Sequence, residues 1–244
     1  MLYNGGGAVN PTKCQVCGSD NLDLAVRCAS CGSILQDSVK SLDLFSTVYN
    51  LWSFPESTLR KVILATHRNY SVLLGILEGI GLSFVMFYVV KAADIYSVSF
   101  PRLIVAGISL GIAVYFPSIL IFSLLAYLIF RVRRTGASLR GFVAGMLYTL
   151  HPVAIGAVFM LPLEVAVFGS YLFSNNPAPQ VINPVSFYFL AFLDVVFGGA
   201  VLLSIWRLSK VLSRSWKFMA GTSGILAVIF AVASEVAKHI LIQK

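Results

Sequence analysis

After residue 68 the chain consists largely of apolar stretches that are long enough to cross a membrane. A transmembrane helix needs about 20 mostly apolar residues, and several such stretches follow one another here. Over the whole chain of 244 residues, 58% are hydrophobic and only 11% are charged. A water-soluble domain carries roughly a quarter of its residues as charges. The sequence therefore predicts an all-α integral membrane protein.

The membrane domain, residues 69–244, is expected to be a five-transmembrane-helix bundle. Two of the apolar runs are longer than a bilayer requires. Pro117 offers a kink site in the first of them, and Pro152 and Pro162 divide the second, because proline cannot donate a helical hydrogen bond. We therefore end the third span before Pro162 and expect a short interfacial helix at 163–173. The predicted spans are 69–90, 103–130, 141–161, 185–207 and 217–238.

The basic residues predict how these spans are oriented. Lys and Arg accumulate in cytoplasmic loops, and here they precede the first span and fill the second and fourth connections. The third connection, 174–184, has no basic residue. We therefore expect the N-terminus in the cytoplasm and the C-terminus outside. The net charge of +8 is explained by this topology, and no nucleic-acid partner is expected.

All four cysteines lie in a polar N-terminal segment, residues 1–36. Cys14 and Cys17, and then Cys28 and Cys31, form two Cys-x-x-Cys-Gly turns. Four thiolates at this spacing are typical of a tetrahedral zinc site. A thioredoxin-like redox motif would use one such pair in a βαβ unit, which is absent here. The segment is predicted to be a cytosolic zinc ribbon with one structural zinc, whose binding supplies its folding energy.

Residues 37–68 form an amphipathic connector between the ribbon and the first span. Leu42, Phe45, Tyr49 and Trp52 recur at helical spacing. A second helix is expected to start at Ser53 and to place Leu59, Val62 and Ile63 on one side. Two interpretations stay open for these connector helices: they lie on the membrane surface, or they pack against the helix bundle.

With two Cys-x-x-Cys-Gly turns and five predicted spans, the chain resembles a zinc ribbon fused to a Yip-family (Ypt/Rab-interacting protein) membrane domain. The membrane half of the resemblance covers roughly residues 53–238. It rests on the block 53–63 and on the loop 136–140 that leads to Tyr148 and His151-Pro152. The resemblance implies a multi-span fold with a cytosolic N-terminal region and, for eukaryotic members, a link to membrane traffic and Rab-type GTPases. The ribbon fusion is similar to prokaryotic members, so we expect the cytoplasmic membrane of a prokaryote.

Three ionisable residues fall near the middle of predicted spans: Glu78, His151 and Asp194. Such residues are costly in a bilayer and usually face the interior of a bundle. We expect them to form an intramembrane polar cluster in which at least two come within hydrogen-bond reach, directly or through water. The cluster has two interpretations, a polar clamp between helices or a proton or ion site. Glu164 is expected near the outer end of the third apolar run.

These features predict a non-enzymatic membrane scaffold or adaptor that presents its zinc ribbon to a cytosolic protein partner. The partner is unknown, the lipid bilayer is the other partner, and a homo-oligomer remains open. The alternative is a transporter or channel component that uses Glu78, His151 and Asp194. An enzyme is not expected. Ser223, in a sequence like that of rhomboid proteases, has no histidine on a later span.

Overall fold

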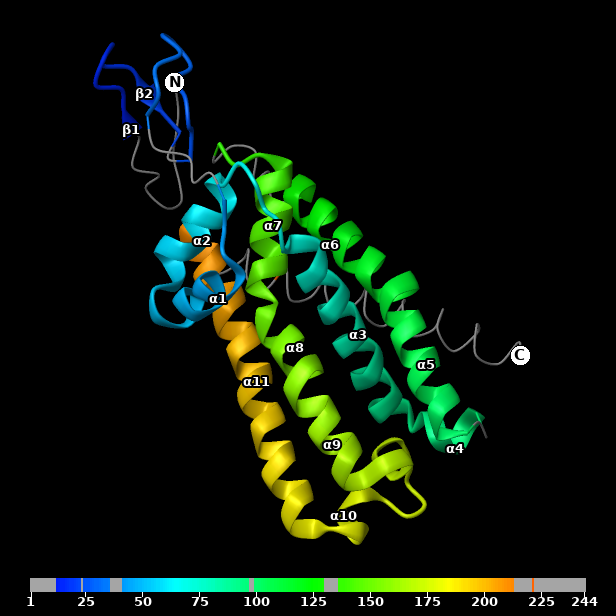
Figure 1. Ribbon diagram of the computed structural model, residues 1–244. Coiled ribbons are helices and arrows are strands. Elements are labelled where there is room, and N and C mark those ends of the chain that lie inside the picture. The colour runs from blue at the N-terminus through cyan, green and yellow to red at the C-terminus, as the bar shows by residue number, and fades with distance from the viewer. Residues whose placement is uncertain are drawn as a thin grey trace. The chain divides into compact units, whose positions relative to one another are not determined.

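The computed structural model describes residues 12–22, 24–35, 41–96, 99–129, 136–212 and 221. The elements in these ranges are mostly helices, with one two-stranded antiparallel sheet near the N-terminus (Figure 1). The strands are β1 (Thr12–Lys13) and β2 (Asp20–Asn21). The helices before the third apolar run are α1 (Leu44–Ser53), α2 (Pro55–Leu64), α3 (Ser71–Val90), α4 (Ala92–Tyr96), α5 (Phe100–Leu110), η1 (Gly111–Tyr115) and α6 (Phe116–Ile129). The later ones are α7 (Leu139–Thr149), α8 (His151–Ile155), η3 (Gly156–Met160), α9 (Leu161–Phe168), η4 (Gly169–Phe173), α10 (Pro179–Ile182) and α11 (Pro184–Val211).

Four of the described helices are long and apolar enough to cross a membrane, so the chain is a multi-pass membrane protein. They span Ser71–Val90, Phe100–Ile129, His151–Phe173 and Pro184–Val211. The first, second and fourth agree closely with the predicted spans at 69–90, 103–130 and 185–207. The fifth predicted span, 217–238, lies outside the described residues except for residue 221.

The third apolar run is divided at a different place from the predicted one. We expected one span at 141–161, but α7 ends at Thr149, and the long apolar helix begins at His151. Leu150 interrupts the helix with ψ near 4°, and Pro152 lies in the first turn of α8. A proline is tolerated in the first turn of a helix, where no hydrogen bond is required of its nitrogen. Pro152 therefore starts a helix here instead of bending one. Residues 163–168 continue this helix, and the short helix η4 follows at Gly169, whose φ is 57°.

The contacts divide the described residues into two compact units. Unit 1 comprises the described residues of Met1–Ser71, Phe122–Thr149 and Leu203–Ile225, and unit 2 comprises those of Val72–Ile121 and Leu150–Leu202.

In unit 1, helix α2 packs against α7 through its apolar side. Leu59, Val62 and Ile63 are buried, and a methyl group on Gly141 of α7 would lie only 2.4 Å from the carbonyl oxygen of Ile63. Arg68 follows the end of α2 and donates hydrogen bonds to the carbonyls of Val62 and Ile63, which cap the helix. For α2, packing against another helix is thus the interpretation that the contacts favour.

Helix α1 leaves its aromatic side exposed. Phe45, Tyr49 and Trp52 are 84%, 69% and 47% exposed, whereas Leu42 is buried. Asp43 caps the start of α1 by accepting a hydrogen bond from the backbone of Ser46. Ser53 is the last residue of α1, and α2 starts at Pro55 without a side-chain cap. The second connector helix therefore starts at Pro55 and not at Ser53 as expected, because proline is favoured in the first turn of a helix.

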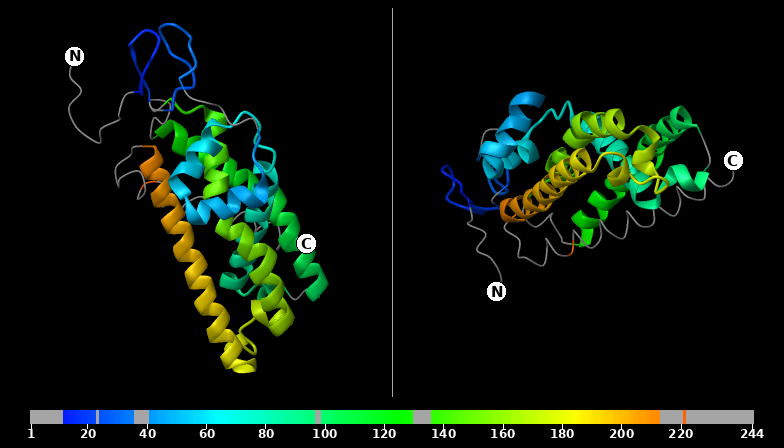
Figure 2. Two further views of the ribbon diagram at one scale, coloured as in Figure 1. Left: turned by 60° about the vertical axis from the view of Figure 1, so that its left-hand side comes forward. Right: turned by 90° about the horizontal axis from the view of Figure 1, so that it is seen from below.

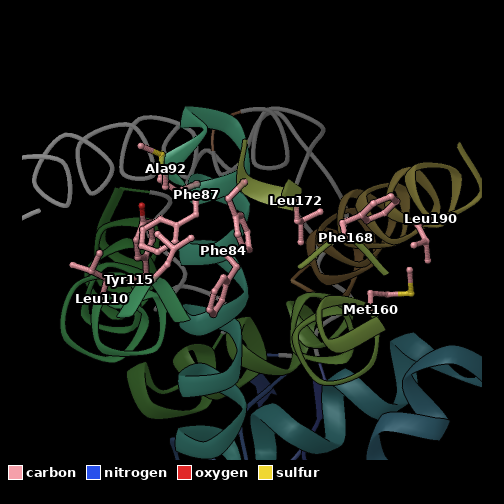
Figure 3. Packing of buried hydrophobic residues seen from close by; sticks show 12 residues of the cluster. Phe84, Phe87, Ala92, Leu110, Tyr115, Met160, Phe168, Leu172 and Leu190 are labelled. Carbon is pink, nitrogen blue, oxygen red and sulfur yellow. The ribbon is translucent and has the colours of Figure 1, made fainter. Parts of the chain in front are cut away.

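The core of unit 2 is built from aromatic side chains on helices that are distant in sequence. Phe84 and Phe87 of α3 contact Phe173 of η4, with ring centroids 5.8 and 6.3 Å apart. Leu103 and Leu110 of α5 belong to the same cluster, and Figure 3 shows Leu110 near Phe84 and Phe87. Beyond the helix ends, the carboxylate of Asp94 accepts hydrogen bonds from the hydroxyl of Ser174 and from the backbone of Asn175. These two hydrogen bonds lower the pKa of Asp94 and fix α4 to the loop after η4.

Small residues allow α3 and α5–η1 to approach closely. Gly79 and Ser83 are four residues apart on α3, and Gly107 and Gly111 are four residues apart on the partner helix. The hydroxyl of Ser83 donates to the carbonyl of Gly107 at 2.6 Å. This pattern of small residues four apart is the usual way in which membrane helices come into close contact.

We predict that Gly79→Ala and Gly111→Ala destabilise the protein by about 1–3 kcal/mol each. A methyl group on Gly79 would lie 2.5 Å from the carbonyl oxygen of Gly111, and one on Gly111 would lie 2.5 Å from Cα of Ile80, so backbone must move. Unfolding of the purified protein in mixed detergent micelles measures the change. Gly199→Ala on α11 is the matched control, since its methyl group would meet nothing within 4 Å. If all three variants unfold alike, the close approach is not a source of stability.

Candidate metal centre

The four cysteines lie on two turns that have the same backbone hydrogen bonds. In the first turn, between β1 and β2, the N–H of Cys14 donates to Ser19 and the N–H of Gly18 donates to Cys14. In the second turn, the N–H of Cys28 donates to Ser33 and the N–H of Gly32 donates to Cys28. A bridge between Arg27 and Ile34 closes the second turn as the β1–β2 pairing closes the first. Figure 2 shows the two resulting loops side by side.

The glycine after each Cys-x-x-Cys pair is required by the backbone. Gly18 and Gly32 have φ of 71° and 72°, in the left-handed region that side chains other than glycine rarely adopt. The near identity of the two angles shows that the repeated sequence folds into a repeated structure. Each turn thereby directs its two thiols to the same side.

The two turns bring the four sulfur atoms together into one cluster. All four Sγ atoms lie within 4.8 Å of one another. The pairs Cys14–Cys31 and Cys17–Cys28, each joining one turn to the other, are 3.6 Å apart. These distances are too long for a disulfide bond, in which the two sulfur atoms are about 2.05 Å apart. All four cysteines are therefore free. The predicted ligands Cys14, Cys17, Cys28 and Cys31 are therefore placed where they could hold a metal ion.

Two serines that the sequence analysis did not single out complete this centre. The hydroxyl of Ser19 lies 3.0 Å from Sγ of Cys17 and 3.1 Å from Sγ of Cys28. The hydroxyl of Ser33 lies 3.0 Å from Sγ of Cys14 and 3.1 Å from Sγ of Cys31. Each serine thus contacts one cysteine of its own turn and one of the other turn. The repeated sequence is in fact Cys-x-x-Cys-Gly-Ser, and its sixth position was the signal that could have revealed them.

Hydrogen bonds lower the pKa of two of the four thiols, Cys28 and Cys14, whereas the neighbouring thiols of Cys31 and Cys28 raise the pKa of Cys17. The Ser19 hydroxyl, followed by the backbone N–H of Cys31, lowers the pKa of Cys28 to about 5. The Ser33 hydroxyl and the backbone N–H of Cys17 likewise lower the pKa of Cys14. Asn21 contributes by donating from Nδ2 to Cys28, while its Oδ1 accepts from the backbone of Ala29. The lowered pKa favours the thiolate form of Cys28, which is the form that binds metals.

A centre with four thiolate ligands has a limited chemistry. Catalytic zinc sites keep one position open for water or substrate, whereas four protein ligands close the coordination sphere. The arrangement suits a structural role, in which the ion replaces the apolar core that so short a segment lacks.

Two of the three predicted intramembrane residues, Glu78 and His151, are buried in unit 2. Glu78 on α3 is completely buried, and His151 at the start of α8 is 2% exposed. Gly81, one turn after Glu78, packs against Val153, which follows His151 by two residues. Neither carboxyl oxygen of Glu78 has a hydrogen-bond partner among the described residues. A contact between Glu78 and His151 through water stays a prediction.

Asp194 has a partner that the sequence analysis did not propose. Its carboxyl group on α11 lies close enough to that of Glu164 on α9 for the two to interact, and both line one cavity. The sequence analysis expects Glu164 near the outer end of the third apolar run and assigns it no partner. The two residues are 30 positions apart in the sequence. Their approach depends on how α9 and α11 are rotated relative to each other, which the spacing of residues in the sequence does not predict.

Comparisons with known proteins found no family model, no curated protein and no solved structure that matches this chain. The resemblance to the Yip family therefore stays an expectation.

Replacing the two bridging serines should weaken metal binding. We predict that Ser19→Ala and Ser33→Ala each lower the metal affinity by about 10–100-fold, the usual effect of losing a group that hydrogen-bonds to a ligand. Competition with a chromophoric chelator on the purified full chain measures this. Ser30→Ala is the matched control, because Ser30 contacts Cys28 only through its backbone N–H. Equal affinities for all three variants would contradict the assigned role of the hydroxyls.

Proposed function

We propose that the protein is a non-enzymatic membrane adaptor that presents a structural zinc ribbon to a cytosolic protein. The observation that carries the proposal is the arrangement of the four thiols in two equivalent turns. It supports a small metal-stabilised module joined to a multi-pass membrane anchor.

Zinc is the metal that best suits the proposed ribbon. Four thiolates at about 2.3 Å from a tetrahedral zinc ion are roughly 3.8 Å apart, close to the 3.6 Å between the paired sulfur atoms. Bound zinc would fix the two turns against each other and would supply no reactivity of its own.

The surface of the ribbon supports a role in protein contact. Val16 at the first turn and Ile34 after the second are 76% and 70% exposed. Exposed apolar side chains on a rigid, metal-fixed loop offer a partner a preformed contact surface, which lowers the entropy cost of binding.

We also propose that the ribbon and the N-terminus face the cytoplasm of a prokaryotic cell, with the C-terminus outside. The distribution of Lys and Arg along the chain supports this orientation. The reducing cytoplasm would keep the four thiols available for zinc.

The adaptor proposal predicts one zinc per chain and a partner that depends on it. Elemental analysis of the full-length protein should give about one zinc, and Cys28→Ser with Cys31→Ser should remove it. A photo-crosslinking amino acid in place of Val16 should capture the partner in cells, and the adducts should disappear in the double variant while the protein stays in the membrane. The matched control is Ser30→Ala, which keeps all four ligands. Stoichiometric iron, or identical adducts with and without the cysteines, would refute the proposal.

A second candidate, a transporter or channel component, is favoured by Glu78. A completely buried carboxyl group in a membrane helix, without a hydrogen-bond partner in the described ranges, is costly unless a proton or an ion uses it. If this candidate holds, proton flux into proteoliposomes should fall at least about tenfold in Glu78→Gln, as expected when the titratable group is lost. Glu56→Gln, an exposed carboxyl in α2, should leave the flux unchanged. Absence of flux in the unmodified protein would remove this candidate.

A further inference from the structure

Unit 2 contains a cavity of about 460 Å³ that has no role in the adaptor proposal. Its walls come from the second half of α3, from the helix that runs through α8, η3 and α9, and from α11. Figures 1 and 2 show α9 beside the first half of α11. Most of the lining is apolar, and the volume falls in the range of about 300–1,000 Å³ that is typical of small-molecule sites.

A stretch of π-helix keeps a series of residues on one face of the helix that forms one wall of the cavity. Pro152, Gly156, Met160 and Glu164 all line the cavity at intervals of four residues. In an α-helix each such step rotates the side chain by about 40°, which would carry Glu164 far from Pro152. The π-helix η3, Gly156–Met160, has more residues per turn and offsets this drift. Glu164 is thereby brought to the same face as Pro152.

Among the described residues that line the cavity, Glu164 and Asp194 are the charged ones, and both are acidic. The two carboxyl groups are close enough to interact with each other. No described residue forms an ion pair with either group. Lys91 lies over the ring of Tyr88, 3.8 Å from its centroid, and its charge interacts with Asp94 instead. The described walls of the cavity therefore carry two acidic groups and no basic one.

We infer that this cavity binds an amphipathic organic cation, with an ammonium group held by Glu164 and Asp194 and an alkyl chain along the apolar walls. An ammonium group has three N–H donors and no acceptor, so it can donate to both carboxylates at once. The aromatic rings of Phe84, Phe173 and Phe197 line the same cavity, and ring faces attract cations. An anion would be repelled, and a neutral chain would leave the carboxyl pair unused.

A metal ion fits this site poorly. Calcium takes six to eight oxygen ligands and magnesium requires an octahedron, whereas the cavity supplies two carboxyl groups among apolar side chains. Within the described residues, the four cysteines are the single group of three or more His, Cys, Asp or Glu side chains placed to hold a metal ion. The chemistry of the walls thus favours a cation with an apolar body.

Photolabelling of the full chain in phosphatidylcholine nanodiscs tests the inference. The probes are decylamine with a diazirine in its chain and the matched alcohol and carboxylic acid, with labelled residues identified by mass spectrometry. We expect the amine to label the wall formed by Val153, Ala157 and Met160 at least about tenfold more than the alcohol, since charge-assisted hydrogen bonds are worth that factor. The acid should label it least.

Variants separate binding by the carboxyl pair from partitioning into lipid. Glu164→Gln with Asp194→Asn should reduce labelling by the amine to the level of the alcohol, and labelling by the alcohol should not change. Glu56→Gln is the control for removal of an acid elsewhere. Gly198→Leu should reduce labelling by both probes, because Gly198 lines the cavity and a side chain there enters open space.

Nanodiscs that contain phosphatidylethanolamine distinguish two sources of the amine. Competition by this lipid would identify a lipid headgroup as the occupant, and unchanged labelling would identify a free amine. Equal labelling of the wild-type wall by amine and alcohol would overturn the inference. So would an amine preference that survives in the double variant, in which case the carboxyl pair only joins α9 to α11.

Discussion

Helices in a bilayer gain no hydrophobic free energy when they associate, because lipid chains are as apolar as the side chains they replace. Unit 2 is held together under this constraint by close packing. Gly79 and Gly111 let two backbones meet, and Ser83 adds a hydrogen bond between them. The phenylalanine cluster around Phe84 then packs on the resulting pair.

The ribbon meets the opposite constraint. It is polar and has too few apolar residues to form a core, and Leu24 is one of its few buried ones. In the proposed zinc site, a bound cation would hold together thiolates that otherwise repel one another. The same chain thus combines two modules whose stabilities respond to different conditions. A chelator should affect the first, and a change of lipid or detergent the second.

The sequence predicts those features that depend on local spacing. The apolar runs locate the described spans, and the two Cys-x-x-Cys-Gly turns locate the sulfur cluster, because both follow from a few consecutive residues. The end of α7 at Thr149 was less predictable, since the effect of Pro152 depends on whether a helix continues through it or begins at it. The contacts of the Ser19 and Ser33 hydroxyls were harder to predict, because each hydroxyl also contacts a cysteine of the other turn and so depends on how the chain reverses between the turns. The contact between Glu164 and Asp194 could not be predicted in this way. It depends on how two helices are rotated relative to each other, and no local sequence pattern specifies that rotation.

The π-helices give the membrane domain a particular kind of sensitivity. Gly111–Tyr115 and Gly156–Met160 have the same form, a glycine that opens a wide turn and a proline six residues after it. A wide turn is equivalent to one inserted residue in an otherwise regular helix. Deleting one residue from it would restore the ordinary hydrogen-bond ladder and leave a straight apolar helix of nearly the same length. The side chains beyond the deletion would keep their faces, because the wide turn had absorbed the extra residue, whereas a deletion elsewhere in the same helix would turn them by about 100°. The effect of losing one residue therefore depends on whether the residue belongs to the wide turn.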